Sequence, residues 1–160
     1  MDIDWNAIQE LVVSHFGLGE HSIHGPEHWE RVERYAVQLA THNGGDLLVV
    51  RLFAKFHDVC RQSDGIDDEH GARGAELARQ LRDTYLDVPD DLFDVFQYAC
   101  RWHTGGKVTT DPTIGACWDA DRLDLWRVGF TPKEQFMSTE FARELVRRGH
   151  IGPRYLPPMP

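Results

Sequence analysis

Several features that mark other classes of protein are missing from this sequence. Its 160 residues include only three cysteines, Cys60, Cys100 and Cys117, which are widely spaced and form no CxxC pair. This spacing excludes a zinc knuckle and a disulfide framework, so the cysteines are expected to be small core residues. No apolar run approaches the length needed to cross a bilayer, so no membrane partner is expected.

Clustered positive charge is missing as well. The chain has 17 Lys and Arg against 26 Asp and Glu, a formal net charge of -9, and it contains no Lys/Arg-rich run. Binding to duplex nucleic acid depends on clustered cations that release counterions, so no duplex partner is expected. The acidic start MDIDWNAIQE does not have the character of a secretory signal, which predicts a cytoplasmic protein.

The rest of the composition is that of a globular protein, with 41% hydrophobic and 27% charged residues. We expect one domain over residues 1–160, with an extended tail from about 150 to 160. Apolar residues recur with helical spacing and no strand pattern stands out, which predicts an all-α, compact bundle of about seven helices. Helices are expected over residues 5–16, 26–42, 47–60, 68–85, 89–105, 112–126 and 131–149.

The segment RLFAKFHDVCRQSDG, residues 51–65, places His57 and Asp58 inside an apolar helix that we expect to be central. Burying an unpaired charge is costly, so the pair needs a partner that the segment itself does not contain. A metal ion would resolve the conflict.

Other imidazole and carboxylate groups occur in an ordered series along the chain. His24 and His28 share a helix face, His70 is expected to begin the fourth helix, and His103 is expected to end the fifth. Asp121 lies in the sixth. Mixed nitrogen and oxygen ligands suit Mn, Fe, Co, Ni or Zn better than an all-oxygen site does. Taken singly, each histidine could equally be a satisfied core residue, and an aspartate near a helix start could be a cap.

The ordered stretches are HGPEHWERV, FHDVCR, DDEHGARGAELA, RWHTGGK and DADRLDL. Over about residues 24–128 this order closely resembles the HD-domain superfamily of metal-dependent phosphohydrolases, an all-helical fold named for its His-Asp doublet. The resemblance matches the family's first metal-binding histidine to His28, its doublet to His57 and Asp58, and its distal aspartate to Asp121. These four residues are therefore expected to bind a metal.

Some branches of the family hold two metals, with extra histidines between the doublet and the distal aspartate. His70 and His103 match those positions, and the resemblance then implies that Asp58 bridges the ions. Thr104 stands where related phosphodiesterases can carry a further histidine. The expected cofactor is thus one or two divalent ions, of Mn, Fe, Co, Ni, Zn or Mg.

The chemistry implied by the resemblance is hydrolysis of a phosphate ester or anhydride, with a nucleotide or another small phosphorylated compound as substrate. Positive side chains should hold the phosphate, and Arg61 is the first candidate because it follows the doublet within one helical turn. The full set of catalytic or phosphate-binding candidates is His24, Arg31, Arg61, Arg73, Lys107 and Arg122. Each arginine could equally form a surface ion pair. Asp124, near Asp121, is expected to pair with solvent or arginine.

Two other functions fit the same pattern. Some HD-type proteins couple two irons to oxygen chemistry, which makes a di-iron oxygenase the first alternative. The superfamily also contains catalytically silent signalling modules, the second alternative. Retention of His28, His57, Asp58 and Asp121 counts against a silent module.

Overall fold

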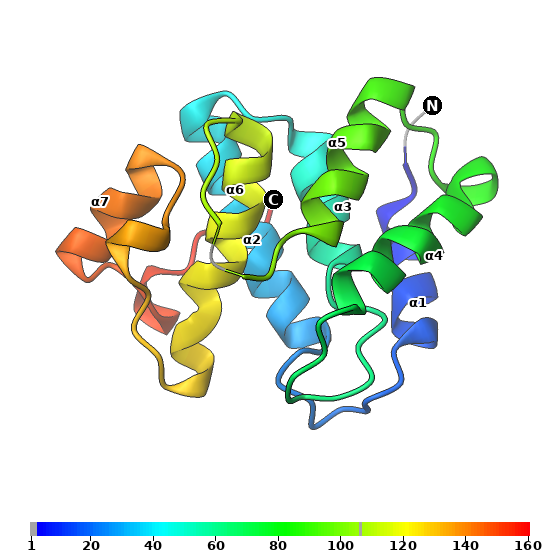
Figure 1. Cartoon of the computed structure of the whole chain (residues 1–160), viewed down its shortest axis with the longest axis horizontal. Coiled ribbons are helices and arrows are strands. Elements are labelled where there is room, and N and C mark those ends of the chain that lie inside the picture. Colours follow the sequence, from blue (N-terminus) through cyan, green and yellow to red (C-terminus); the bar gives the residue numbers. More distant parts are fainter. Residues whose placement is uncertain (1–2, 106) are drawn as a thin grey trace.

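The computed structural model describes residues 3–105 and 107–160, and within these ranges the chain is helical and has no strand. Figure 1 shows the arrangement, with α7 and α1 at opposite sides of the bundle. The α-helices are α1 (Trp5–His15), α2 (Pro26–Asn43), α3 (Leu47–Phe56), α4 (His70–Tyr85), α5 (Asp90–Arg101), α6 (Pro112–Leu123) and α7 (Glu140–Arg148). Short 3-10 helices are η1 (Asp124–Val128), η2 (Glu134–Phe136) and η3 (Pro153–Tyr155). The all-α prediction is confirmed.

Local sequence signals account for many of the helix ends. The side chains of Asp46, Asp111 and Thr139 accept hydrogen bonds from backbone N–H groups in the first turns of α3, α6 and α7. Gly44 and Gly149 end α2 and α7 in the left-handed conformation, which glycine adopts without steric cost. These caps set the direction in which each helix leaves its loop.

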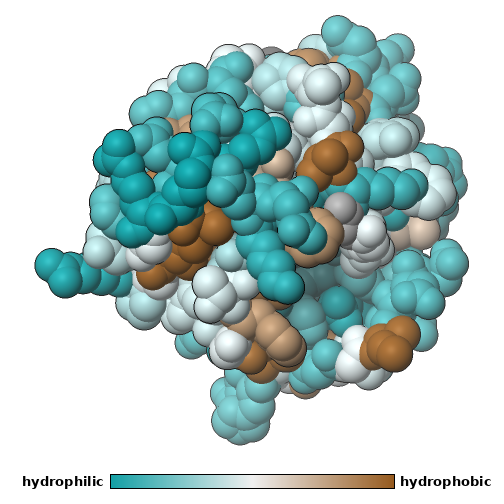
Figure 2. Space-filling view, turned by 60° about the vertical axis from the view of Figure 1, so that its left-hand side comes forward, coloured by the Kyte–Doolittle hydropathy of each residue, from teal (hydrophilic) through white to brown (hydrophobic). Residues whose placement is uncertain are grey.

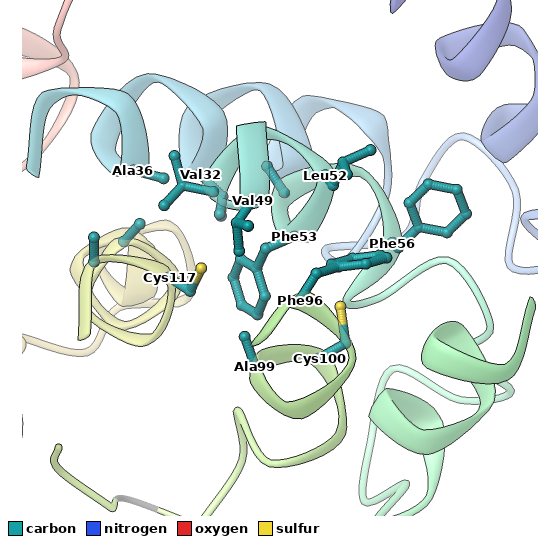
Figure 3. Close-up of a cluster of buried hydrophobic side chains, with 14 of the residues drawn as sticks. Val32, Ala36, Val49, Leu52, Phe53, Phe56, Phe96, Ala99, Cys100 and Cys117 are labelled. Carbon is teal, nitrogen blue, oxygen red and sulfur yellow. The ribbon is translucent and has the colours of Figure 1, made fainter. Parts of the chain in front are cut away.

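The core is built around α3, as its apolar character predicts. Figure 3 shows Phe53 and Phe56 of α3 lying between the helices on either side, with Val32 of α2, Phe96 of α5 and Cys117 of α6 around them. All five of these side chains are fully buried. Burying one side chain of this size stabilises the fold by about 1.5–3 kcal/mol, so α3 is a rigid support for the residues immediately after it in the chain.

Two helices end earlier than expected, and in each case a histidine side chain lies just past the end. The α3 helix stops at Phe56, so His57 and Asp58 lie beyond it, where we expected a helix to residue 60. The His57 ring Nδ1 lies 3.2 Å from the Ala54 carbonyl oxygen, the acceptor that the Asp58 N–H would use in a continued helix. The α5 helix stops at Arg101 and not near 105, and the Ala99 carbonyl accepts from the Trp118 indole at 3.0 Å.

The expected helices at 112–126 and 131–149 are also wrong in their extent. The α6 helix ends at Leu123, and the chain tightens into η1. The segment after Thr131 forms only the short η2 before α7 begins at Glu140. The buried Asp119 carboxylate accepts from the backbone N–H groups of Ser138 and Thr139, at 2.7 Å each, and so fixes the start of α7 later than predicted.

The tail after α7 packs onto α2. The carbonyl oxygen of Pro157 accepts from Arg34 Nε, and η3 interrupts the otherwise extended chain that we expected from 150 to 160. In the parts of the chain that the structure describes, no helix combines the length and the apolar character needed to span a bilayer.

Two loops meet at one end of the bundle, along the lower edge of Figure 1. The first connects α1 to α2 and the second connects α3 to α4. The Ser22 hydroxyl of the first donates to the Asp64 carboxylate of the second, and His24 Nε2 lies 3.3 Å from the Asp64 carbonyl oxygen. These contacts join the loop that precedes α2 to the loop that follows Asp58.

Candidate metal centre

Six imidazole and carboxylate side chains from five segments of the chain converge in the interior. They are His28 in α2, His57 and Asp58 after α3, His70 at the start of α4, His103 after α5 and Asp121 in α6. Three sets of residues have ligand atoms that all lie within 4.8 Å of one another, and these are His28, His57 and Asp121; Asp58, His70 and His103; and His24, His28 and Asp58. Only Asp121 among the six is partly accessible, with 21% of its side chain exposed. These six residues were predicted from the sequence to meet, and the structure brings them together.

The first group surrounds the Nε2 atoms of His28 and His57, which lie 3.2 Å apart. The Asp121 Oδ1 atom is 3.1 Å from the first of these nitrogens and 3.6 Å from the second. The Asp58 Oδ2 atom is 3.4 Å and 3.5 Å from them. Both imidazole nitrogens thus lie within 3.6 Å of one oxygen from each of the two aspartates.

The second group uses the other oxygen of the same aspartate. Asp58 Oδ1 lies 3.0 Å from His70 Nε2 and 3.6 Å from His103 Nε2, and these two nitrogens are 2.8 Å apart. Because each oxygen of Asp58 faces a different pair of histidines, its carboxylate joins the two groups.

Each of the four histidines points its Nε2 atom toward the cluster, because its Nδ1 atom forms a hydrogen bond on the opposite side of the ring. The Nδ1 partners are the Asp124 carboxylate for His28 and the carbonyl oxygens of Phe53, Asp67 and Cys100 for His57, His70 and His103. Such acceptors require a proton on Nδ1, so a neutral ring offers a lone pair at Nε2. Two lone pairs that face each other at 2.8–3.2 Å need a proton or a cation between them. This donor set fits a metal ion with nitrogen and oxygen ligands.

The charges of the centre compensate one another. Burial lowers the pKa of His28, but the carboxylates of Asp121, Asp124 and Asp58 outweigh burial and raise the pKa to about 10. Burial raises the pKa of Asp58, but His57 and His103 among its neighbours hold that pKa well below its usual value. The pKa of Asp121 is likewise well below its usual value, because His28 and His57 outweigh the effect of burial. Positive charge is therefore needed beside these carboxylates, whether from protons or from a metal ion.

A glycine makes the second group possible. A Cβ atom on Gly71 would lie 2.3 Å from the Cys100 carbonyl oxygen and 3.0 Å from His103 Nδ1. Real Cβ atoms do not approach other atoms so closely, so only glycine lets the first turn of α4 pack against the end of α5. The close approach places His70 beside His103.

Two of the predicted phosphate-binding residues lie against the cluster. Arg61 Nε donates to Asp58 Oδ1 at 3.2 Å, and its Nη1 donates to the carbonyls of Ser63 and Gly65. His24 Nδ1 lies 3.1 Å from Asp58 Oδ2.

The other four predicted phosphate-binding residues lie further out. Arg31 donates to the Asp124 carboxylate and Arg73 to the Asp67 carboxylate, so both hold residues that orient the histidines. Lys107 lies over the Trp102 ring, and Arg122 donates to the Phe136 carbonyl.

Three residues next to the centre were not predicted from the sequence. Asp124 was expected to pair with solvent or arginine, and it does pair with Arg31, but it is also fully buried and contacts His28, which was not predicted. Its spacing of three from Asp121 on one helical face was the available signal. Arg127 Nη2 lies 3.3 Å from His24 Nδ1, and Asp67 supports His70 through its carbonyl. No sequence pattern marks either of these two.

A comparison with known proteins finds similarity to a solved structure. No known family's sequence model matches the chain, and no curated protein matches it. The chain is similar to the crystal structure, at 1.45 Å resolution, of a predicted HD superfamily hydrolase from an uncultured Thermotogales bacterium. The identity is 28%, the TM-score is 0.70, and the match covers 90% of this chain and 83% of that chain. This likeness and the His/Asp cluster confirm the predicted resemblance.

Proposed function

From the HD-superfamily fold and its buried His/Asp cluster, we propose that this protein is a metal-dependent phosphohydrolase. The reaction is hydrolysis of a phosphate ester or anhydride of a nucleotide or another small phosphorylated compound. The observation that carries the proposal is the convergence of four inward-facing Nε2 atoms on the two oxygens of Asp58. Structural ion pairs do not require four imidazoles oriented in this way, whereas a metal centre does.

The two groups define the residues that would hold the metal. His28, His57, Asp58 and Asp121 would hold a first ion, and Asp58 with His70 and His103 would hold a second. A bound divalent ion lowers the pKa of a coordinated water toward neutrality and polarises a phosphoryl oxygen. Asp121 is the partly exposed member of the set, so we expect substrate to approach on its side.

The contacts of the surrounding residues suggest their roles. Arg61 holds Asp58 and the loop carbonyls of Ser63 and Gly65, and its Nη2, which has no hydrogen-bond partner among the described residues, is the atom that we assign to a phosphate oxygen. His24 Nδ1 faces both the Asp58 carboxylate and Arg127 Nη2, and we assign His24 as the candidate proton donor to the leaving group. The apolar wall of α3 excludes bulk water from the inner side of the cluster.

The test is release of inorganic phosphate from a panel of nucleotides and phosphate esters, with Mn, Fe, Co, Ni, Zn and Mg supplied singly. We expect at least one ion to support turnover that Asp121→Asn abolishes. The exposed Asp94→Asn should keep the parental rate. The proposal fails if no ion supports hydrolysis of any compound in the panel.

The same six ligands can hold two irons, which keeps the di-iron oxygenase as a second candidate. Its supporting observation is the shared carboxylate of Asp58 between two pairs of histidines. Oxygen consumption by the ferrous protein, without release of phosphate from any ester, would favour this candidate over hydrolysis.

A further inference from the structure

A pocket with a volume of about 410 Å³ opens beside His103, the histidine just after α5. Its apolar walls come from the region after α6, and they are Leu125, Phe130, Pro132, Phe136 and Met137. Figure 2, which brings the α6 and α7 side forward, shows a hollow in this face with apolar side chains nearby. A mostly apolar cleft of this volume, with a few polar groups, is typical of small-molecule sites.

The charged residues that line the pocket distinguish it from a second hollow, near the start of α1. Among the described residues of its lining, none is acidic, and the basic ones are Arg122 and Lys133 together with His103. The chain as a whole has a net charge of -9. The second hollow, which is larger, is lined by Asp4, Asp83 and Asp90 among others. The pocket beside His103 can therefore receive a molecule that carries a phosphate without repelling it.

Arg122 contributes a hydrogen-bond donor that the described protein atoms leave unused. The residue is only 7% exposed, and its Nη1 donates to the Phe136 carbonyl at 2.6 Å. Its Nη2 is buried and has no partner among the described residues. A buried donor without an acceptor costs about 1–3 kcal/mol, so an acceptor atom on a bound molecule would remove a real penalty. Arg122 lines the same pocket as His103, which is a member of the candidate metal centre.

We propose that this pocket binds the organic group of the substrate and that Arg122 Nη2 donates to an acceptor on that group. The substrate class is a phosphate ester whose organic group is an uncharged, largely apolar ring with a carbonyl or ring-nitrogen acceptor. A sugar or polyol phosphate would leave its hydroxyls unpaired against Leu125, Phe136 and Met137. This inference rests on the proposed phosphohydrolase function, and it makes Arg122 a specificity-determining residue.

Binding of alcohols that carry no phosphate tests the pocket apart from the reaction. The full-length protein is titrated with 3-acetylbenzyl alcohol, with 3-ethylbenzyl alcohol, which lacks the acceptor, and with glycerol, and binding is measured by ligand-observed NMR. We expect the two ring alcohols to bind and glycerol not to bind. The parent should bind the acetyl compound more tightly than the ethyl compound. In Arg122→Met this ratio of affinities should be about tenfold smaller, because one hydrogen bond to a charged donor is lost.

Two further variants show whether a loss of binding comes from the pocket or from misfolding. Arg79→Met removes an exposed arginine on α4 and should bind all three compounds as the parent does. Phe130→Ser changes a side chain that is 67% exposed, so it should fold normally and weaken both ring alcohols. Circular dichroism checks each variant.

The outcomes separate this inference from the proposed function. If the parent hydrolyses phosphate esters but does not bind the ring alcohols, the pocket proposal is overturned and the phosphohydrolase stands. It is also overturned if Arg122→Met keeps the parental preference. If the ring alcohols bind through Arg122 but no ester is hydrolysed, the pocket assignment holds and the proposed reaction fails.

Discussion

At the residue scale, the orientation of each histidine depends on the group behind its ring. In three of the four inward-facing histidines, Nδ1 forms a hydrogen bond with a backbone carbonyl oxygen, which mutation of a side chain cannot remove. His28 is different because it donates to the carboxylate of Asp124, at 2.7 Å, and that carboxylate also accepts from Arg31. A carboxylate behind a ligand fixes the ring and increases its basicity, so this contact is the one that mutagenesis can test.

Replacing Asp124 with Asn should therefore weaken metal binding without removing a direct ligand. Asn keeps the size of the side chain but loses its charge, so we expect metal affinity to fall about 10- to 100-fold. Competition with a chromophoric chelator measures the change, and Asp94→Asn is the matched control. Parental affinity in folded Asp124→Asn would show that this carboxylate does not support the ligand.

Arg61→Lys tests the guanidinium just after the doublet. Lysine keeps the charge but cannot reach Asp58, the loop carbonyls and a phosphate oxygen at once, because it lacks the planar fork. We expect kcat/KM for the best substrate to fall about tenfold or more with unchanged metal content, the loss expected for a hydrogen bond to a charged group. Steady-state kinetics checks this, with Arg79→Lys as the surface control. If Arg61→Lys and Arg61→Ala both retain the parental rate, Arg61 does not bind phosphate.

The candidate ligand residues could be singled out in the sequence because the order of their motifs resembles that of the HD-domain superfamily. The residues behind them could not. Asp67 supports His70 through its backbone, and any residue type could present that carbonyl. Asp124 supports His28 through its side chain, from the position where α6 ends and η1 begins. Such contacts depend on loop conformation, which periodicity does not encode.

At the scale of elements, the centre depends on α4 approaching α3 and α5 unusually closely. The segment HGARGAELA places small residues on the face of α4 that meets them. A Cβ atom on Gly74 would lie 2.2 Å from the Phe56 carbonyl oxygen, at the end of α3. Because that neighbour is backbone, it cannot move aside as a flexible side chain could, and α4 would have to shift away from Asp58.

Gly74→Ala should consequently destabilise the protein although alanine favours helices. We expect the free energy of unfolding to fall by about 1–3 kcal/mol, the usual cost of overpacking a tight contact. Gly17→Ala is the control, because no atom lies within 4 Å of its added Cβ, and its effect should stay within about 0.5 kcal/mol. Urea unfolding measures both. A Gly74→Ala protein as stable as the parent would contradict the close packing of α4.

Helix number and order were predictable at this scale, but several helix ends were not. The caps at Asp46 and Asp111 are local, and they begin α3 and α6 where expected. The start of α7 depends on Asp119, which lies twenty residues away from Thr139 in the chain and caps its backbone. The Thr131–Pro132 pattern predicted a start that this long-range contact overrides.

At the scale of the whole molecule, the centre connects helices that are distant in sequence. Its six side chains come from α2, α6 and the segments at the ends of α3, α4 and α5. The buried carboxylates repel one another unless positive charge lies between them. A metal ion bound by all of these segments would therefore stabilise the entire bundle and not one loop.

Thermal unfolding tests this connection. A ligand that binds only the folded state at 100 times its Kd stabilises it by about 2.7 kcal/mol, which for a chain of this size raises Tm by about 5–10 °C. We expect that rise when the chelated protein is reloaded with its preferred ion. A smaller rise is expected in Asp124→Asn at the same ion concentration. An identical Tm for chelated and metal-loaded parent would contradict a site shared by several helices.

The most direct test of the whole account is the metal content of the protein with and without Asp58. Asp58 faces both groups of histidines, and Asp58→Asn keeps its shape while removing its charge. Elemental analysis after dialysis against divalent transition metals should find at least one ion per parental chain. Folded Asp58→Asn and Asp58→Ala should have lost both the ion and the activity. Full metal occupancy in these variants, or a parent that binds no ion, would contradict the assignment of this cluster as a metal centre.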